Sequence, residues 1–169
     1  LQQLEEECNI PVFISLCDAL TKLNKGDSIS PLIIAAREGL SNLLFALLSD
    51  INDDDLNSLH MDDGSTVLMS AVSNCRLNTA NILLNRNINL NAVNILKNTA
   101  LHCAVHQRDV ELTNLLLEKG VDPNLKNVHG HNALMLSVIF DDINIFNILI
   151  KVTQDINSKD QHGNTALYM

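Results

Sequence analysis

The sequence repeats itself with a period of 33 residues. A short hydrophobic stretch that opens with a small polar residue recurs along the chain, and its copies open at Ser30, Thr66, Thr99, Asn132 and Thr165. The successive intervals are therefore 36, 33, 33 and 33 residues, and the longer first interval carries an acidic insert around residues 53–55. Repeats of this length are typical of solenoids, in which each unit buries its apolar face only against its neighbours.

Each full copy predicts two helices. The third copy opens Thr99-Ala100-Leu101-His102-Cys103-Ala104, and a second apolar stretch with helical spacing follows about ten residues later. These second stretches are residues 42–48, 79–84, 110–118 and 143–150. Two residues before the opening residue, most copies have a glycine, as a tight turn with positive φ requires, and two residues after the second stretch the third copy has Gly120.

Two departures from this pattern put non-glycine residues at turns. Lys97 stands where the turn glycine is expected, which predicts either a turn strained by ~1–2 kcal/mol or a left-handed conformation at Asn98 instead. Cys75, Arg108 and Asp141 replace the glycine between the two helices, which only Gly39 retains.

The pattern resembles the ankyrin repeat, whose period is 33, whose opening is T-P-L-H-x-A and whose end is G-A-D-x-N. The third copy matches it almost position by position, from Thr99 to Asn127, and the resemblance covers residues 27–169. It implies an α-solenoid, an ankyrin repeat stack with two antiparallel helices and a β-hairpin loop per repeat. An amphipathic stretch at residues 9–24 predicts an N-terminal capping helix. The expected divisions are a capping region at 1–26, repeats at 27–61 (with the acidic insert), 62–94, 95–127 and 128–160, and an incomplete repeat at 161–169.

Composition restricts the partner. Hydrophobic residues make up 46% of the chain and aromatic residues 3%, so we expect a globular core of small aliphatic side chains. The formal charge of −9 argues against direct nucleic-acid binding and favours a protein partner with a basic and apolar surface.

No apolar run reaches the ~20 residues of a membrane span, so we expect no membrane insertion. The four cysteines form no C-x-x-C motif, which favours reduced thiols in an intracellular protein of the cytoplasm or nucleus. We expect a monomer that continues into further repeats or domains.

No group of residues predicts catalysis, and we expect neither enzyme activity nor a cofactor. His129, His131 and His162 would lie on adjacent loop tips, but a zinc site usually takes four ligands, and no cysteine or carboxylate is expected at a matching tip. The resemblance implies that His102 is structural and bonds within and between repeats. The acidic run 50–55 lacks the glycine and glutamate of a calcium-binding loop, so we predict a solvated acidic turn.

The resemblance also implies which residues contact a partner, because the family's contact positions lie on the hairpin tips and on the outer side of each first helix. Carried onto this chain, these positions are Asp62, Asp63, Ser65, Ser73, Asn74, Ile95, Leu96, Asn98, His106, Gln107, Val128, His129, His131, Ile139 and Phe140. The apolar members are expected to form one exposed patch. For Phe140 the alternative is packing against a neighbouring repeat.

Three classes of function agree with these observations. The first is a protein-protein interaction module in a regulatory, inhibitory or scaffold protein, including the cytoplasmic domain of a channel. The second is the non-catalytic ankyrin portion of a larger enzyme, such as a ubiquitin ligase, a kinase or a bacterial effector. The third is a self-associating structural stack. The resemblance favours the first class, although a fold alone does not determine function.

Overall fold

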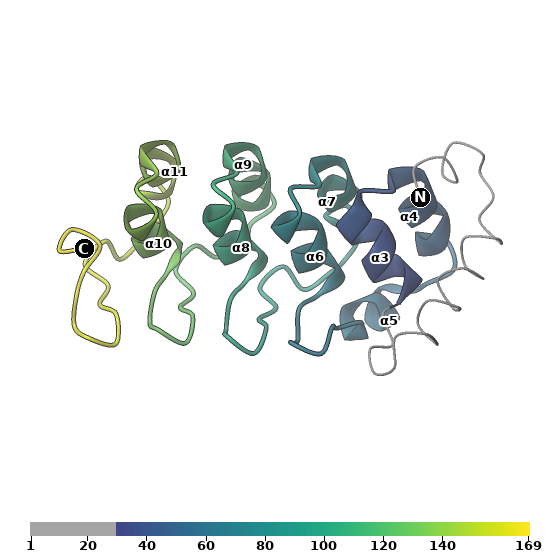
Figure 1. Ribbon diagram of the computed structural model, residues 1–169, viewed down its shortest axis with the longest axis horizontal. Helices are drawn as coiled ribbons and strands as arrows, with labels where there is room; N and C mark the ends of the chain where they lie inside the picture. The colour runs from purple at the N-terminus through teal and green to yellow at the C-terminus, as the bar shows by residue number, and fades with distance from the viewer. Residues whose placement is uncertain (1–29) are drawn as a thin grey trace. The chain divides into compact units, whose positions relative to one another are not determined.

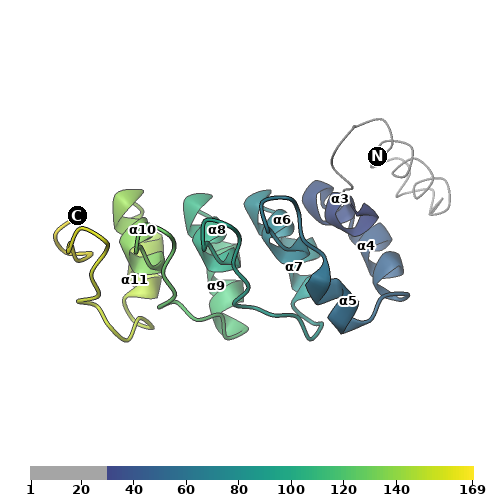
Figure 2. The same cartoon turned by 90° about the horizontal axis from the view of Figure 1, so that it is seen from below.

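A computed structural model describes residues 30–169, so the predicted capping helix at 9–24 lies outside the described residues. The chain divides between Ile88 and Asn89 into an N-terminal unit and a C-terminal unit. Each unit is built from pairs of short helices joined by tight turns (Figures 1 and 2). Among the helices of residues 30–169, none has the length and apolar character needed to cross a membrane.

From residue 30 onwards, the N-terminal unit contains two helix pairs and one extra helix. Its helices are α3 (Pro31–Glu38), α4 (Ser41–Leu48), α5 (Asp53–Ser58), α6 (Val67–Ser73) and α7 (Leu77–Leu83). Helix α3 packs against α4 and α6 against α7, and the pairs meet through α3 with α6 and α4 with α7. Leu44, Met69 and Leu83 are fully buried at these contacts, as the apolar periodicity predicts.

The C-terminal unit repeats the same arrangement. Its helices are α8 (Ala100–His106), α9 (Val110–Glu118), α10 (Ala133–Ile139) and α11 (Ile143–Leu149). Helix α8 packs on α9 and α10 on α11, while α10 packs on α8 and α11 on α9. The buried core consists of aliphatic side chains such as Leu101, Leu112, Leu134 and Ile145. The predicted all-helical repeat architecture is thus present in both units.

The small polar residue that opens each of the first four copies is the N-cap of the first helix. The side-chain oxygens of Thr66, Thr99 and Asn132 each accept a hydrogen bond from the backbone amide three residues further on, at 3.2, 3.4 and 3.0 Å. Ser30 accepts from the amide two residues further on, at 3.3 Å. Because the first amides of a helix have no partner inside it, such a cap stabilises the helix by ~1 kcal/mol. The sequence period therefore marks helix starts.

The turn between paired helices uses a left-handed residue in every repeat. Gly39 has a φ of 79°, and Cys75, Arg108 and Asp141 take φ values of 55°, 56° and 52° at the equivalent positions. In each case the following amide donates to a carbonyl five residues back, which ends the first helix. The three non-glycine residues take this conformation at a cost of ~1–2 kcal/mol each.

Residues 53–58 of the acidic insert are helical, so the prediction of a turn is wrong there, although Asp54 and Asp55 are exposed to solvent as predicted. Asn52 caps α5 by accepting a hydrogen bond from the Asp55 amide at 2.8 Å, and its own amide group donates to the Asp55 carboxylate at 2.7 Å. The acidic residues lie in the first turn, where negative charge interacts favourably with the helix dipole. Leu56 is 3% exposed and fixes the helix to the core.

The loop that precedes α8 contains a left-handed residue that is not glycine. Lys97 itself has a φ of 56°, and Asn98 does not take the left-handed conformation. The expectation that Asn98 would take it instead is therefore wrong, and the strain falls on Lys97.

Candidate protein-binding surface

Four loops of similar construction precede the opening residues at Thr66, Thr99, Asn132 and Thr165, and the first three of them lead into the helices α6, α8 and α10. We call them fingers, and they comprise residues 61–65, 94–98, 127–131 and 160–164. In each finger the first amide donates to the carbonyl oxygen four residues further on, at distances of 2.9, 3.1, 3.0 and 2.9 Å. The described residues contain no regular strand in these loops and only one isolated bridge, between His60 and Thr66. The fingers are thus hairpin turns too short to form strands.

A side-chain anchor holds each finger of the C-terminal unit. The Oδ1 atoms of Asn94, Asn127 and Asp160 each accept hydrogen bonds from the amides two and four residues further on, at 2.8–3.1 Å. These three residues are spaced by 33, a regularity that the sequence analysis missed. Since the side chain occupies the inside of the turn, it fixes the backbone and leaves the tip side chains free to vary.

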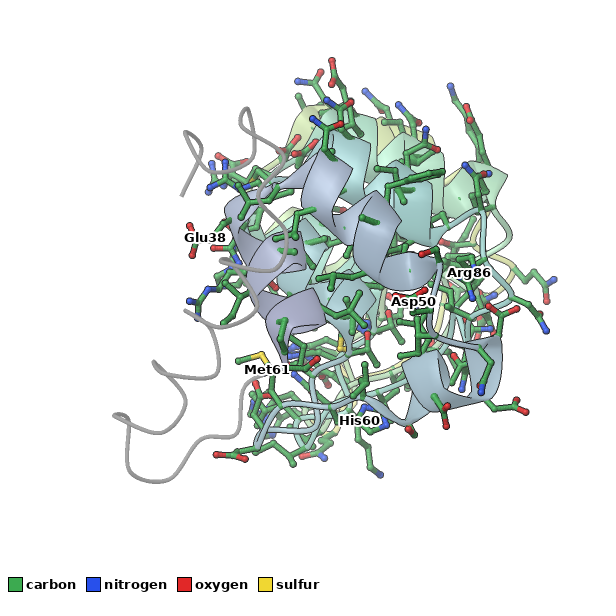
Figure 3. All side chains as sticks on the ribbon, turned by 90° about the vertical axis from the view of Figure 1, so that its right-hand side faces the viewer. Glu38, Asp50, His60, Met61 and Arg86 are labelled. Carbon is green, nitrogen blue, oxygen red and sulfur yellow. The ribbon has the colours of Figure 1, made fainter. Side chains whose placement is uncertain are left out.

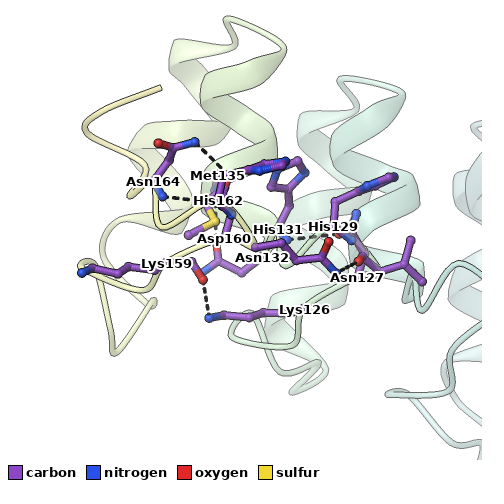
Figure 4. Close-up of polar contacts among 12 residues, drawn as sticks. Lys126, Asn127, His129, His131, Asn132, Met135, Lys159, Asp160, His162 and Asn164 are labelled. Atoms are coloured by element: carbon purple, nitrogen blue, oxygen red, sulfur yellow. Dashed lines mark hydrogen bonds and ion pairs between the residues drawn. The ribbon is translucent and has the colours of Figure 1, made fainter.

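Neighbouring fingers of the C-terminal unit are bonded to one another. The Val128 amide donates to the Leu96 carbonyl oxygen at 2.9 Å, and the Gln161 amide donates to the His129 carbonyl oxygen at 3.2 Å. Lys126 Nζ also donates to the Lys159 carbonyl oxygen at 2.8 Å (Figure 4). Hydrogen bonds therefore connect the three fingers of this unit into a row.

His102 connects the first helix of its repeat to the next finger. Its Nδ1 accepts from the Thr99 amide at 3.2 Å, and its Nε2 lies 3.0 Å from the carbonyl oxygen of His131. With Nδ1 as an acceptor, the neutral ring carries its proton on Nε2 and donates to that carbonyl. Burial lowers the pKa of His102, so the ring is neutral near pH 7. Its structural role, with bonds inside and between repeats, agrees with the prediction.

A second histidine lies against a buried carboxylate. His131 Nε2 is 3.7 Å from Asp160 Oδ2, and the rings of His129 and His131 are 5.8 Å apart. Burial lowers the pKa of His131, and nearby His129 and His162 act in the same direction against the opposing charge of Asp160. The pKa of Asp160 is lowered because hydrogen bonds, chiefly from Asn164 and His162, outweigh the effect of its burial.

Asp160 places a carboxylate beside His131, but it does so from the base of the last finger and not from its tip. It is committed to its own finger through the anchoring bonds and a further contact with the Asn164 side chain (Figure 4). Within residues 30–169, no three histidine, cysteine or acidic side chains are placed to hold a metal ion together.

The predicted contact residues of the C-terminal unit form two groups. Ile95, Leu96 and His129 are exposed on the fingers, with Asn98, Val128 and His131 partly buried beside them. His106, Gln107, Ile139 and Phe140 lie at the C-terminal ends of α8 and α10. On the fingers, the Val128 amide donates to the Leu96 carbonyl oxygen, and at the helix ends the ring of Phe140 packs against the ring of His106. The prediction that the two groups form one patch stays a prediction.

Comparison with known protein families decides the classification. The family model described as ankyrin repeats (3 copies) matches three overlapping segments, at residues 8–94, 32–127 and 90–160. The chain belongs to the ankyrin repeat family. Ankyrin repeats are generally protein-protein interaction modules and are typically non-catalytic. A search of curated proteins finds no match.

Phe140 is less exposed than the ankyrin contact pattern predicted. Its ring is partly buried and packs edge-to-face against His106, with 5.1 Å between ring centroids and an interplanar angle of 84°. The expectation of an exposed Phe140 is therefore wrong, and the alternative of packing against a neighbouring repeat is the one observed, since His106 belongs to the preceding repeat. The expectation of an exposed Val128 is also wrong, because Val128 is partly buried. Ile95, Leu96 and Ile139 are exposed as expected, at 68%, 50% and 45%.

The predicted contact residues of the N-terminal unit are all polar. Asp62, Asp63 and Asn74 are exposed, while Ser65 and Ser73 are partly buried. The Asp63 carboxylate accepts from both the amide and the hydroxyl of Ser65, at 2.8 and 2.9 Å, and so holds this finger in place of the anchor found in the other three. Asn74 is the C-cap of α6 and donates to the Ser70 carbonyl oxygen at 2.8 Å.

Arg86 is an important residue that the sequence analysis missed. Its guanidinium donates at 2.7 Å to each of three acceptors, the Asp53 carboxylate and the carbonyl oxygens of Leu48 and Ile51. Figure 3 shows Arg86 and Asp50 on the side of the unit away from Met61 and Glu38. The arginine therefore joins the end of α4 to the start of α5. No local signal predicts this, since the partners lie 33–38 residues earlier in the chain.

The N-terminal unit also contains an open, mainly apolar pocket of about 320 Å³ between α4 and α7. Phe45, Leu48 and Ile82 provide its apolar lining, and Arg86 lies at its edge. Phe45 is 71% exposed. The equivalent position in the following three repeats is asparagine in each case, at Asn81, Asn114 and Asn147.

Proposed function

We propose that this chain is a protein-binding module that recognises a partner protein through its fingers and the outer ends of its first helices. The observation that carries the proposal is the construction of the fingers. Their backbones are fixed by recurring internal hydrogen bonds, while the same tip position holds Asp62, Ile95, Val128 or Gln161 in successive repeats. A pre-ordered backbone that presents variable side chains loses little conformational freedom on binding, which favours affinity and specificity.

The chemistry of the fingers supports a partner with both basic and apolar surface. Asp62 is exposed on a finger of the N-terminal unit, and the chain carries a formal charge of −9. Ile95 and Leu96 offer apolar area on a finger of the C-terminal unit. We further propose a regulatory, inhibitory or scaffold role in the cytoplasm or nucleus. The alternative is a non-catalytic ankyrin portion of a larger enzyme, or the cytoplasmic domain of a channel.

Affinity capture with the whole chain, followed by mass spectrometry, would identify candidate partners. Binding of a purified candidate would then be compared for Asp62→Lys and Glu118→Lys, two exposed charge reversals of equal size on a finger and on the second helix α9. We expect Asp62→Lys to lower the association rate several-fold at low salt, with a smaller effect at high salt. Glu118→Lys should leave the rate close to that of the parent chain. Equal effects of the two variants would mean that net charge alone acts, and the fingers would lose their proposed role.

A further inference from the structure

Finger 94–98 differs in chemistry from the other two fingers of the C-terminal unit. Three aliphatic side chains project from it and from the residue before it: Val93 is 48% exposed, Ile95 68% and Leu96 50%. The equivalent positions in the next finger are Lys126, Val128 and His129, and in the last finger Lys159, Gln161 and His162. The same loop is therefore built elsewhere in this unit with mostly polar residues.

The fold does not need these aliphatic side chains. The anchor of the finger is Asn94, and Leu96 takes part only through its backbone, with its amide bonded to Asn94 and its carbonyl oxygen to Val128. In the last finger the polar residue His162 makes the equivalent backbone hydrogen bond, since its amide donates to the Asp160 side chain. Three exposed aliphatic side chains within four positions of the chain are typical of an interaction surface.

The accessible charge around this apolar surface is positive. Lys97, Lys126 and Lys159 are all exposed on or beside the three fingers. Within residues 93–98, 126–131 and 159–164 the only acid is Asp160, and its side chain is 3% exposed and bonded inside its own finger. This part of the surface is thus locally basic although the whole chain is acidic.

We propose that the surface formed by Val93, Ile95 and Leu96 with the neighbouring Lys97 is a docking site for a partner segment that presents aliphatic or aromatic side chains next to carboxylates. The apolar side chains would bury against the finger, and the carboxylates would pair with the exposed lysines. The inference rests on the proposed function and names the partner chemistry for the C-terminal unit. The proposed partner chemistry differs from that expected at finger 61–65 of the N-terminal unit, where the exposed Asp62 suits a basic partner.

A library of random 12-residue peptides displayed on phage provides the probe. The library would be selected on the whole chain, and the most enriched peptides would be synthesised and titrated against purified variants. The test variant combines Val93→Lys, Ile95→Gln and Leu96→His, which are the residues that the last finger carries at these positions and which the loop therefore accepts. The matched control is Ile143→Gln, since Ile143 is 65% exposed at the start of α11. A charge pair, Lys97→Glu and Lys151→Glu, compares a lysine on the finger with an exposed lysine beyond α11.

We expect the enriched peptides to combine aliphatic or aromatic residues with aspartate or glutamate. Their affinity should fall at least tenfold for the triple variant and severalfold for Lys97→Glu, and should stay within about twofold of the parent for both controls. Circular dichroism melts of each variant would show that the fold is retained.

The inference would be overturned by enriched peptides rich in lysine and arginine, by equal affinity for the triple variant and the parent chain, or by no enrichment over an empty phage. Peptides whose binding is lost in Asp62→Lys but kept in the triple variant would overturn the docking site and leave the proposed function standing. Failure of the proposed function itself is read from the partner-capture experiment, in which Asp62→Lys is compared with Glu118→Lys.

Discussion

His102 Nε2 lies 3.0 Å from the carbonyl oxygen of His131, which belongs to the next repeat. The other ring nitrogen accepts from the Thr99 amide, so one neutral imidazole both completes the cap of α8 and holds the following finger. Protonation would place a second N–H on Nδ1, so this nitrogen could no longer accept from the Thr99 amide, although it could still donate to Thr99 Oγ1 at 2.8 Å. The ring can therefore serve both contacts only while it is neutral.

We predict that stability falls as the pH drops from about 7 to 5. Burial lowers the pKa of His102 in the folded chain below its ordinary value of 6.5, so the unfolded chain binds more protons than the folded chain as the pH falls through that value. The stabilising contribution is fully present above pH 6.5 and is lost below it. Urea denaturation at a series of pH values measures the slope. His131 has a pKa lowered in the same direction and adds to it.

His102→Met tests the assignment, because methionine occupies the equivalent position in two other repeats, at Met69 and Met135. The variant loses both ring hydrogen bonds, and we expect it to be less stable by about 1–2 kcal/mol near pH 7.5. Its stability should also depend less on pH between 7 and 5. A slope equal to that of the parent chain would show that His102 does not titrate with folding.

Gly130 is predicted to be the most sensitive finger glycine of the C-terminal unit. A Cβ there would lie 2.8 Å from the Gln161 backbone nitrogen and 3.0 Å from the Asp160 carbonyl carbon, in the next finger. Gly120 is the matched control, since its φ of 90° is similarly unfavourable but a Cβ would meet nothing within 4 Å. We expect Gly120→Ala to cost about 1 kcal/mol and Gly130→Ala clearly more, measured by denaturant unfolding. Equal losses of stability for the two variants would mean that fingers 127–131 and 160–164 can move apart without cost.

The sequence predicted those elements that repeat with the period. Thr66, Thr99 and Asn132 were located as opening residues, and the structure shows them to be N-caps. The second helices fall within two residues of their predicted limits, because an apolar face packed on a neighbour at every turn gives a clear periodic signal. The predicted exposure of Ile95 and Leu96 is also observed.

Elements that depend on single long-range contacts were not predicted. Helix α5 is six residues long and has one buried apolar residue, Leu56, which is too few to show a period. Its attachment depends on Arg86, 33 residues after Asp53. Packing of Phe140 against a neighbouring repeat was offered as an alternative, but its partner, the ring of His106 in the preceding repeat, could not be named from the sequence. Such contacts become evident only when the repeats are placed side by side.

Arg86 is predicted to hold α5 through its planar guanidinium, which donates to three acceptors at once. Lysine keeps the charge but cannot reach all three, so Arg86→Lys should destabilise the chain by about 1–2 kcal/mol, a modest value because the side chain is 27% exposed. Hydrogen exchange at the α5 amides should accelerate, while exchange in α9 stays unchanged. Arg76→Lys is the control, because Arg76 is exposed and its Nε donates to one carbonyl oxygen, that of Arg37. Unchanged exchange in α5 would argue that Leu56 alone holds the helix.

Phe140 allows stability and binding to be separated in one side chain. A partly buried ring in edge-to-face contact with His106 should cost about 1–2 kcal/mol on truncation to alanine, below the ~3–5 kcal/mol of a fully buried phenylalanine. A double-mutant cycle with His106→Ala should give a coupling of about 0.5–1.5 kcal/mol for the ring contact.

If Phe140 also contacts the partner, its truncation should weaken binding at least roughly tenfold per folded molecule. Ile139→Ala, at the neighbouring exposed position, shows the effect of losing apolar area without the ring contact. A thermal melt and a titration with a captured partner distinguish the two roles of Phe140. If Phe140→Ala lowers stability but leaves the affinity per folded molecule unchanged, Phe140 is a packing residue only.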